Sequence, residues 1–342
     1  MNEISNNIQN TMDKNPLVSI CLFVYNQEKY FRQAIESLLM QRSSFSYEII
    51  VHDDASTDNT KAIIEEYVLN FPHIIKPIFQ QQNKYSLYGM SYLIKYVTLK
   101  AKGEYIALCA GDDYWIDPIK VQKQVEFLES NPDYGLVHTR AAKFSEDKGV
   151  FDGIHGARVD NLEDLLTECS IAALTVCLRS NLVRKYFEEI KPEEHKIWTT
   201  EDFPMWVWFM RHSKFKFLED YTSVYRSRLG SVSHVEDDYK RLIFSEGVYD
   251  IVDYYLKKYE DVNKSEKIRA RYYSNMISMY FLTKRWDGIR TSIKVFNNAN
   301  DWLNLLWIGI TLPFFYSRFL IKASYRVRNI LFDLLNIYPI RK

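Results

Sequence analysis

The chain has 342 residues, which is enough for one large domain or for two. Apolar residues make up 47% of the sequence, enough for a sizeable core, and the 44 basic residues balance the 44 acidic ones. This balance provides no overall field that would attract nucleic acid. The four cysteines show no metal-ligand spacing, which fits a reducing compartment.

The N-terminal residues carry no targeting pattern. Residues 1–15 are polar and rich in asparagine, and they lack the apolar centre of a signal peptide, so we predict a disordered tail. No segment reaches the roughly 18 uninterrupted apolar residues of a membrane-spanning helix. We therefore expect a cytoplasmic protein, with the cytoplasmic face of the inner membrane as one place where it acts.

From Pro16 onwards, strand and helix patterns alternate along the chain. Four apolar segments are typical of strands: VSICLFV (18–24), YEIIV (47–51), IKPIFQ (75–80) and GEYIALCA (103–110). Three segments with helical spacing lie between them: 28–41, 61–71 and 90–101. Strands that alternate with helices predict an α/β fold with a mostly parallel sheet and helices on both of its faces.

The second half of the chain has a different character. Residues 141–165 are polar and contain glycines, which predicts a loop or an irregular insertion. Residues 175–180 and 181–190 then resemble one more strand and helix. Beyond about Lys240 long helical patterns dominate. We accordingly predict one catalytic domain over residues 16–240 and a C-terminal helical region over residues 241–342.

Acidic pairs follow two of the predicted strands. Asp53 and Asp54 come directly after the second strand, and Asp112 and Asp113 come after GEYIALCA. Parallel strands bring such ends into one crevice, where open α/β sheets bind ligands. Asp53 or Asp54 can accept a hydrogen bond from a nucleobase or a ribose hydroxyl, although a capped junction before the next helix explains them too.

The second acidic pair favours a cation. Two adjacent carboxylates repel each other, and Mg²⁺ or Mn²⁺ with bound phosphates would compensate them. A solvated turn is the alternative, but Tyr114 and Trp115 follow at once, and such rings prefer at least one covered face.

Two further segments carry candidate site residues. In TTEDFPMW, Asp202 has the position of a helix cap ahead of Pro204, and a carboxylate held there can also be a general base. In VYRSRLGSVSH (224–234), Arg226 and Arg228 can meet phosphates or sugar hydroxyls. His234 can be a ligand, although a lone histidine is more often structural or solvated.

Taken in order, these motifs resemble the family 2 glycosyltransferases. The matching segments cover about residues 17–235: SICLFVYN, IIVHDDASTDNT, GEYIALCAGDDYWIDP, TEDFPMW and VYRSRLGSVSH. The resemblance implies a Rossmann-like fold of the glycosyltransferase A type. It also implies an inverting, metal-dependent transfer of one sugar from a nucleotide-diphosphate donor, a UDP-sugar, to a glycan or lipid-linked acceptor.

The resemblance also implies roles for individual residues. Tyr25 would border the base, with Asn26 beside it, Asp54 would bind the uracil and Asp53 would support the loop. Asp112 would reach the ribose or the metal, Asp113 would ligate Mn²⁺ or Mg²⁺, and Asp202 would be the catalytic base. The remaining candidates for substrate or phosphate contacts are Glu201, Trp115, Arg226, Arg228 and His234.

Departures from the family pattern are informative. Arg228 stands where some members use a histidine near the metal, and Phe23 stands where many carry a small or hydroxylated residue. The Gln-x-x-Arg-Trp signature of processive synthases is absent, because Lys284-Arg285-Trp286 lacks the glutamine, and this favours transfer of one sugar at a time. The alternatives are a catalytically silent nucleotide-sugar-binding subunit and a nucleotidyltransferase, although the latter would need an early glycine-rich phosphate loop.

The C-terminal segment suggests contact with a membrane. Residues 302–317 carry no charge, and Pro313 would interrupt a helix within them. Beyond them the cations punctuate apolar residues: Arg318, Lys322, Arg326, Arg328, Arg341 and Lys342. The aromatic residues suit a water–lipid boundary: Trp302, Trp307, Phe314, Phe315 and Tyr316. We predict an anchor in the plane of the membrane, with helices packed on protein as the alternative.

Overall fold

A computed structural model describes residues 15–167, 169–228, 237–259, 262–299, 301–311, 321 and 324–328. The chain forms two compact units. Unit 1 comprises residues 1–196 and 201–229, and unit 2 comprises residues 197–200 and 230–342. Apart from Asn15, the predicted tail 1–15 lies outside the described residues. The domain boundaries at 16–240 and 241–342 stay a prediction.

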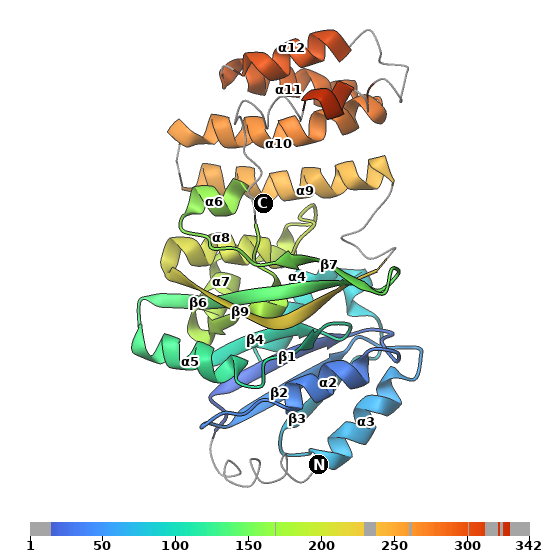
Figure 1. Ribbon diagram of the computed structural model, residues 1–342, viewed down its shortest axis with the longest axis vertical. Helices are drawn as coiled ribbons and strands as arrows, with labels where there is room; N and C mark the ends of the chain where they lie inside the picture. The colour runs from blue at the N-terminus through green and yellow to red at the C-terminus, as the bar shows by residue number, and fades with distance from the viewer. Residues whose placement is uncertain are drawn as a thin grey trace. The chain divides into compact units, whose positions relative to one another are not determined.

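Unit 1 is built on a single mixed sheet (Figure 1). The described strands run in the order β3-β2-β1-β4-β8-β6-β9-β5, and β7 pairs with β6. They span β1 (Val18–Val24), β2 (Tyr47–Asp53), β3 (Ile75–Phe79), β4 (Tyr105–Ala110), β5 (Tyr114–Trp115), β6 (Tyr134–Ser145), β7 (Val150–His155), β8 (Cys177–Arg179) and β9 (Lys214–Ser227). Strands β1 to β4 are parallel, as is β6 with β9, and β8 joins the two halves in antiparallel pairing. The predicted α/β fold class is confirmed.

Helices connect these strands and cover both faces of the sheet. The helices of unit 1 are α2 (Phe31–Leu39), α3 (Thr60–Asn70), α4 (Lys84–Thr98), α5 (Lys120–Ser130), α6 (Leu162–Thr167), α7 (Ser180–Ile190) and α8 (Phe203–His212), with the 3₁₀ turns η2 (Ala173–Thr175) and η3 (Pro192–Glu194). Helices α2, α3 and α5 share a core with one face of β1, β2 and β4. On the opposite face, Tyr96 of α4 contacts His52 of β2.

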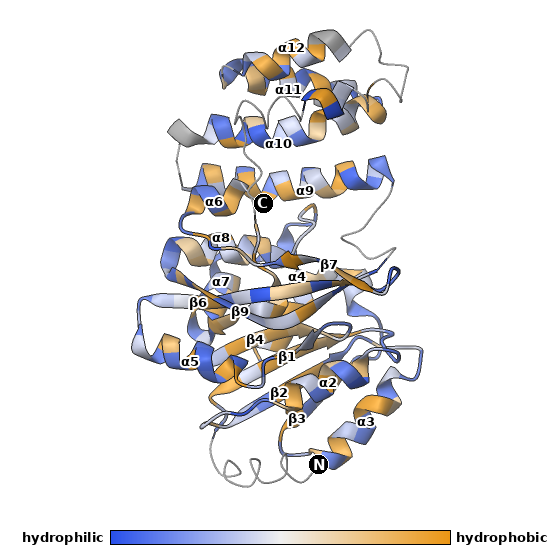
Figure 2. Cartoon of the chain, viewed as in Figure 1, coloured by the Kyte–Doolittle hydropathy of each residue, from blue (hydrophilic) through white to orange (hydrophobic). Residues whose placement is uncertain are grey.

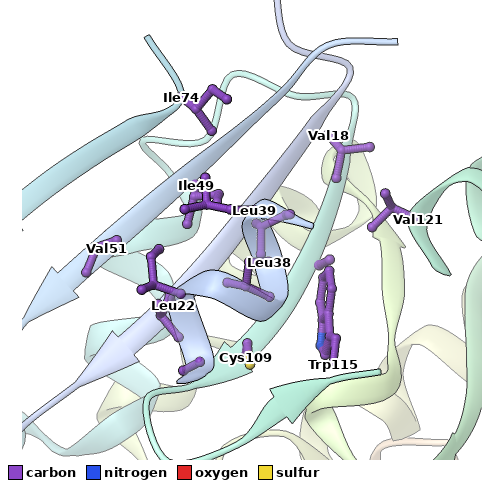
Figure 3. Packing of buried hydrophobic residues seen from close by; sticks show 14 of the residues in the cluster. Val18, Leu22, Leu38, Leu39, Ile49, Val51, Ile74, Cys109, Trp115 and Val121 are labelled. Carbon is purple, nitrogen blue, oxygen red and sulfur yellow. The ribbon is translucent and has the colours of Figure 1, made fainter. Parts of the chain in front are cut away.

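The core forms because the central strands are apolar on both faces. Side chains of β1 and β2 meet Leu38 and Leu39 of α2, with Trp115 and Val121 at one end of the cluster (Figure 3). Hydrophobic residues follow the central strands, whereas the surrounding helices mix hydrophobic and hydrophilic residues (Figure 2). Each buried aliphatic side chain contributes about 1.5–3 kcal/mol to folding, so this cluster holds the parallel strands in one register.

Register places three strand ends side by side. Val24 at the end of β1 pairs with Asp53 at the end of β2, and Phe23 pairs with Ala110 at the end of β4. The turn after β4 approaches β1 closely, since the Gly111 N–H donates to the Phe23 carbonyl at 2.8 Å. A Cβ on Gly111 would lie 3.2 Å from the Val24 methyl groups, so glycine permits this approach.

The interpretation of residues 141–165 as a loop or irregular insertion is wrong over its first part. Strand β6 extends to Ser145, and β7 returns beside it as a hairpin. Side chains of β7 are almost entirely exposed, so this strand has the composition of a loop. Its backbone is nevertheless paired with β6, and β6 is in turn paired with β9, which no local pattern records.

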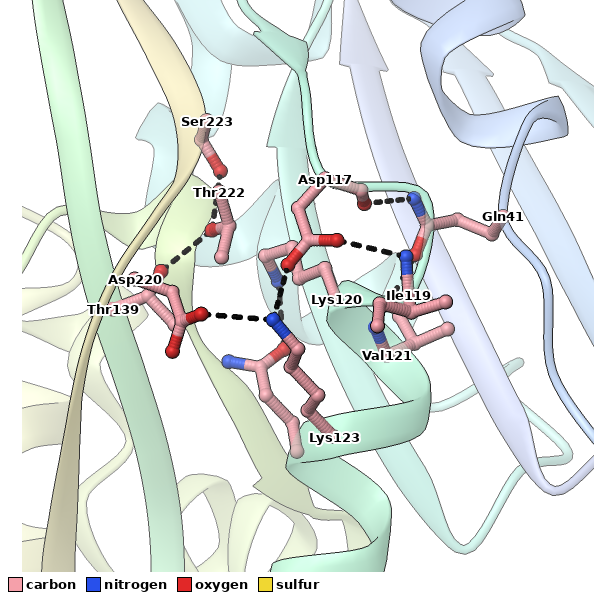
Figure 4. A network of polar contacts seen from close by, with 11 residues as sticks. Gln41, Asp117, Ile119, Lys120, Val121, Lys123, Thr139, Asp220, Thr222 and Ser223 are labelled. Atoms are coloured by element: carbon pink, nitrogen blue, oxygen red, sulfur yellow. Dashed lines mark hydrogen bonds and ion pairs between the residues drawn. The ribbon is translucent and has the colours of Figure 1, made fainter.

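A polar junction fixes the start of α5 (Figure 4). The Asp117 carboxylate accepts hydrogen bonds from the Ile119 N–H at 3.0 Å and from Lys123 Nζ at 3.0 Å. The side chain of Gln41 donates to the Asp117 carbonyl and accepts from the Val121 N–H. This junction ties α2 to α5 and so supports the short segment that carries Asp112 and Asp113.

Unit 2 is helical in its described part. It contains α9 (Asp238–Lys258), α10 (Val262–Leu282), α11 (Trp286–Asn298) and α12 (Trp302–Thr311), which share a core around Phe281, Phe296 and Trp307. The predicted C-terminal helical region is therefore present. Among the described residues, every helix is too short or too polar to cross a membrane.

The described side chains of the predicted membrane anchor are partly buried and partly exposed. Trp307 is buried against Phe281, and Arg328 is buried over the Trp307 ring and donates to Asn304 at 3.0 Å. Trp302 is 65% exposed, by contrast. The other residues of that hypothesis lie largely outside the described part, and the anchor stays a prediction.

We predict that His138 makes folding sensitive to acid. This side chain of β6 is fully buried against Phe217, neither ring nitrogen has a hydrogen-bond partner in the described part of the chain, and burial lowers its pKa to about 3. The unfolded chain binds a proton below about pH 6.5 that the folded chain excludes, so the free energy of unfolding decreases as the pH falls. Between pH 7 and pH 5, the wild type should lose about 2 kcal/mol more than His138→Leu.

Urea denaturation at the two pH values measures this difference. The matched control is His73→Leu, which replaces an exposed histidine and should keep the wild-type pH dependence. Equal losses in the wild type and in His138→Leu would contradict the prediction.

Candidate active site

The ends of β1 and β2 carry two interlocked loops. Tyr25, just after β1, is 43% exposed, and the adjacent Asn26 has a positive φ of 51°. The Asn26 N–H donates to Ser56 Oγ at 2.9 Å, and Asn26 Oδ1 accepts from the Thr57 N–H at 2.7 Å. Ala55 in the second loop also has a positive φ, of 63°. Two left-handed non-glycine residues at adjacent strand ends are the kind of local strain that clusters at functional sites.

Asp53 and Asp54 face different partners at the end of β2. Asp53 Oδ1 accepts hydrogen bonds from both the N–H and the hydroxyl of Ser56, which closes the loop. Both oxygens of Asp54 accept backbone N–H groups at the start of α4, from Lys84 and Tyr85, each at 2.8 Å. Asp54 is 2% exposed, yet a carboxylate has about four acceptor positions, which leaves capacity for a ligand.

The acidic pair after β4 lies beside the end of β9. Strand β5 pairs with β9, which brings the backbone of Arg226 to the turn that carries Asp112 and Asp113, called the acidic turn below. The Arg226 N–H donates to Asp113 Oδ1 at 2.8 Å, and Arg226 Nε donates to the Asp112 carbonyl at 2.8 Å. Arg228 forms an ion pair with Asp112 Oδ2 at 2.6 Å. Burial, followed by the charge of Asp112, raises the pKa of Asp113 well above its usual value.

The rest of the Arg226 guanidinium is also engaged. Its two terminal nitrogens donate to Glu146 at 2.8 Å and to Gln33 at 2.7 Å, and the Tyr30 ring lies 4.7 Å from its centre. Lys29 also donates to Glu146, at 2.6 Å, and together with Arg226 it lowers the pKa of Glu146 to about 2. Arg226 therefore organises the acidic turn from within the protein.

Glu146, Gln33 and Tyr30 are site residues that the sequence analysis missed. Glu146 follows β6, in the segment that was taken for a loop, and Gln33 and Tyr30 belong to the start of α2. A charged residue directly after a strand that pairs with β9 would have been a signal for Glu146, but only if the β6–β9 pairing had been recognised.

Asp202 begins helix α8, as its spacing from Pro204 predicted. It is the N-cap residue, and its carboxylate accepts from the Phe203 N–H at 2.7 Å. The first two turns of α8 are buried, including Met205 and Trp206. Burial raises the pKa of Asp202, and burial together with the charge of Asp202 raises the pKa of Glu201 to about 7.

The remaining candidates occupy different environments. Trp115 is 1% exposed, and its indole N–H donates to the Leu174 carbonyl at 3.0 Å, with Lys120 Nζ 4.1 Å from its ring centre. Arg228 is partly exposed at the acidic turn. His234 lies outside the described residues. The roles of all these residues stay predictions.

The start of α4 links two parts of the site. Asp54 holds the N–H groups of Lys84 and Tyr85 from one side. Burial and, after it, the charge of Glu201 raise the pKa of Tyr85. The structure thus gathers Asp53, Asp54, Asp112, Asp113, Arg226 and Arg228 at the carboxyl edge of the sheet.

The described residues contain no group of three or more His, Cys, Asp or Glu side chains arranged to hold a metal ion. A cation at the edge of the sheet would therefore have at most two such side chains of the described residues as ligands. A separate cavity near Arg158, Asp160 and Lys214 lies at the amino ends of β6 and β9, away from the acidic residues.

We predict that Arg226→Met destabilises unit 1 strongly. The substitution leaves the Glu146 carboxylate and the Asp112 carbonyl without their buried donor, and breaking a buried pair in this way costs about 3 kcal/mol. The control is Arg32→Met, because Arg32 pairs with Glu66 through two hydrogen bonds on the open surface. Arg32→Met should lower the free energy of unfolding by less than about 1 kcal/mol. Urea denaturation of both variants measures the difference, and similar small losses would contradict a central role for Arg226.

Comparison with known proteins identifies relatives of this chain. Mycobacterial relatives without an assigned activity are 46% identical over 116 residues, 34% of this chain, and the chain spans about a third of their length. UDP-Glc:alpha-D-GlcNAc-diphosphoundecaprenol beta-1,3-glucosyltransferase WfaP of Escherichia coli is 30% identical over 184 residues, which are 53% of this chain and 68% of WfaP.

Two solved structures share the fold. S. aureus TarS 1-349 in complex with UDP-GlcNAc has a TM-score of 0.55 at 18% identity, covering 91% of this chain and 90% of that one. Mannosyltransferase PcManGT from Pyrobaculum calidifontis in complex with GDP-Man and Mn2+ has a TM-score of 0.50 at 14% identity, covering 96% and 89%. The sequence profile of Glycosyl transferase family 2 matches residues 19–190, which is half of the chain. This match shows that the chain belongs to glycosyltransferase family 2, and the acidic pairs at the ends of β2 and β4 are consistent with it.

Proposed function

We propose that this chain transfers one sugar, with inversion, from a nucleoside-diphosphate donor to a hydroxyl of a glycan or lipid-linked acceptor. The observation that carries the proposal is the position of two acidic pairs at the ends of β2 and β4, which flank the end of β1 at one edge of the sheet. Such an edge can bind a charged nucleotide on one side and activate a hydroxyl on the other.

The donor is a UDP-sugar in this proposal. Asp54 would accept the uracil N3–H with the lone pairs that α4 leaves free, and the exposed ring of Tyr25 would border the base. Asn26 and Asp53 would hold the two loops around it. The names of WfaP and of the TarS complex, which specify UDP-Glc and UDP-GlcNAc, support this choice.

A divalent cation, Mn²⁺ or Mg²⁺, fits the acidic turn. Asp113 is buried next to a second carboxylate, and in the described part of the chain no side-chain cation pairs with it, whereas Asp112 already pairs with Arg228. Carboxylate oxygens are the ligands that these ions prefer, and Mn2+ in the PcManGT complex is consistent with this. When bound, the cation would offset the charge that develops on the leaving diphosphate.

Asp202 is the general base in this proposal. Its carboxylate would take the proton of the acceptor hydroxyl while the oxygen attacks the anomeric carbon from the face opposite the diphosphate. The bond to the diphosphate breaks as the new glycosidic bond forms. The hydrogen bond from the Phe203 N–H fixes its orientation, and burial brings its pKa closer to the range useful for proton abstraction.

Two alternatives lead to different measurements. A silent nucleotide-sugar-binding subunit would bind UDP-sugars without releasing UDP, and a nucleotidyltransferase would release pyrophosphate from a nucleoside triphosphate. The purified chain, incubated with a panel of nucleotide sugars and acceptors and assayed for released nucleoside diphosphate, distinguishes all three. Release of UDP that depends on an acceptor would support transfer.

The acceptor is lipid-linked in the form of the proposal that we favour. The name of WfaP specifies a diphosphoundecaprenol-linked acceptor. Trp302 and Leu306 of α12 expose 65% and 55% of their surface, which suits a peripheral contact with the cytoplasmic face of a membrane. This location is part of the proposal.

We predict that Asp202→Asn loses transfer but keeps the fold. Asparagine caps helices as well as aspartate does, so the melting temperature and UDP affinity should remain near wild type. Removal of the base should lower kcat by roughly 10²–10⁴-fold. Asp237→Asn is the control, because Asp237 is the N-cap of α9, where it accepts from the Lys240 N–H, and its replacement should have no effect on transfer. Near-normal turnover in Asp202→Asn would show that Asp202 only caps the helix and is not the base.

We predict that Asp113→Asn abolishes the effect of divalent cations on UDP binding. The amide oxygen can still accept the Arg226 N–H, so the turn should keep its conformation. Loss of electrostatic stabilisation at the leaving group typically costs at least 10²-fold in kcat. Calorimetric titration of UDP with and without MnCl₂ measures the coupling, and Asp133→Asn, at an exposed ion pair, is the control. Unchanged Mn²⁺ dependence in Asp113→Asn would exclude Asp113 as the ligand.

A further inference from the structure

A row of tyrosines marks helix α4. Tyr88, Tyr92 and Tyr96 recur every fourth residue, and Lys84 and Lys100 continue the same spacing at the two ends. Gly89 interrupts the helix between Tyr88 and Tyr92, so it is the contacts between the side chains, and not the spacing alone, that make them one row. The nucleotide and base assignments above use none of them.

The rings of this row contact one another. The centroids of Tyr88 and Tyr92 are 4.8 Å apart, and those of Tyr92 and Tyr96 are 6.2 Å apart with nearly parallel planes, at 13°. Lys84 Nζ lies 5.6 Å from the Tyr88 ring centre, and Lys100 Nζ lies 4.8 Å from that of Tyr96. The row is therefore an ordered surface with a cation at each end.

One end of the row is open and the other is anchored. Tyr96 contacts the buried His52 of β2, which explains it as cover for the sheet. Tyr88, in contrast, is 52% exposed, and its neighbours Tyr85 and Leu87 are 44% and 55% exposed. Packing among the described residues of unit 1 leaves these three large side chains exposed within four residues, and contiguous exposed apolar surface is typical of interaction sites.

Gly89 separates the open end from the rest of the helix. Its φ of 76° and ψ of 172° are not helical, and nothing lies within 4 Å of the position where a Cβ would be. The turn Lys84–Tyr88 is consequently positioned by its own contacts. Asn83 caps it by accepting from the Ser86 N–H at 2.7 Å, and Asp54 accepts from the Lys84 and Tyr85 N–H groups.

The open end adjoins the proposed donor site. Asp54, the proposed base-binding carboxylate, holds the first turn of α4 through the Lys84 and Tyr85 N–H groups. A molecule lying on the tyrosine row would thus reach the edge of the proposed donor site, where an acceptor has to meet the donor.

We propose that Tyr88, Tyr92 and Tyr96, with Tyr85 at their inner end, bind the sugar rings of the acceptor. The proposal rests on the transferase function proposed above and names the class of ligand that the site would take. The C–H face of a pyranose packs on an aromatic face, and the tyrosine hydroxyls and the two lysines can donate to sugar hydroxyls. Cation–π contacts at exposed positions are weak, so a sugar can displace Lys84 from Tyr88.

The occupant is a carbohydrate because of the chemistry of the row. Each ring carries a hydroxyl, the row ends in cations, and the ring spacing is comparable with the length of one sugar unit. A lipid surface would be matched better by Leu, Phe or Trp with cations at the margin only. The centroids of the three rings follow one another at 4.8 Å and 6.2 Å, so the row offers more than one ring face to a chain of sugars.

The test combines direct binding with kinetics on the full chain. Wild type, Tyr88→Ala and Tyr88→Phe are titrated by calorimetry, in the presence of UDP, with a panel of oligosaccharides of glucose, galactose, mannose and N-acetylhexosamine. Tyr239→Ala, at an exposed tyrosine of α9, is the matched control. We expect Tyr88→Ala to weaken binding of the oligosaccharide by about tenfold, and Tyr88→Phe and Tyr239→Ala to bind like wild type. UDP affinity and melting temperature should not change in any variant.

The outcomes separate this proposal from the proposed function. Oligosaccharide binding that depends on Tyr88, without release of UDP from any donor, would refute the transferase and keep the sugar-binding surface. Transfer with an acceptor KM that is the same in wild type and Tyr88→Ala would refute the surface alone. Two other results would overturn it: no oligosaccharide binding to wild type, or Tyr88-dependent binding to phosphatidylglycerol vesicles in place of oligosaccharides.

Discussion

The buried guanidinium of Arg226 is the interaction on which the site depends. It lies at the end of β9, and its partners are Gln33 of α2, the turn after β4, and Glu146 after β6. A buried arginine is tolerated only when its donors are satisfied, so the acidic turn, α2 and β6 must all be in place before Arg226 can be buried. The geometry of the acidic turn is therefore a property of the whole sheet.

Four carboxylates at one edge of a sheet repel each other, and the protein compensates each in a different way. Asp53 is held by Ser56, Asp54 by the backbone N–H groups of α4, and Asp112 by Arg228. Asp113 has one backbone N–H, and in the described residues no cationic side chain pairs with it. Burial, followed by the charge of Asp112, raises its pKa. A bound cation would supply that partner, which is why the donor complex should be the state in which this edge is most stable.

The sequence predicts a feature when the residues that define it lie within one short segment of the chain, and fails when they are far apart in the chain. The continuous apolar runs of β1, β2 and β4 and the acids that follow them are local, and so is the cap at Asp202. Strand β7 is exposed along its length, so its pairing left no trace in its composition. Glu146 and Gln33 reach the site through Arg226, 80 and 193 residues away in sequence, and no spacing rule connects such positions.

The tyrosine row of α4 lies between these two cases. Its four-residue period is visible in the sequence, and it predicts a stripe on one helix face. A stripe of this kind is usually core, and Tyr96 over His52 follows that rule. Tyr88 does not follow that rule, because Gly89 interrupts the helix after it. The first turn of α4 is held by Asp54, and the rings of Tyr85 and Tyr88 are exposed. The carboxylate that orders the proposed donor site also sets the position of the proposed acceptor surface, so occupation of the two sites should be energetically coupled through Asp54.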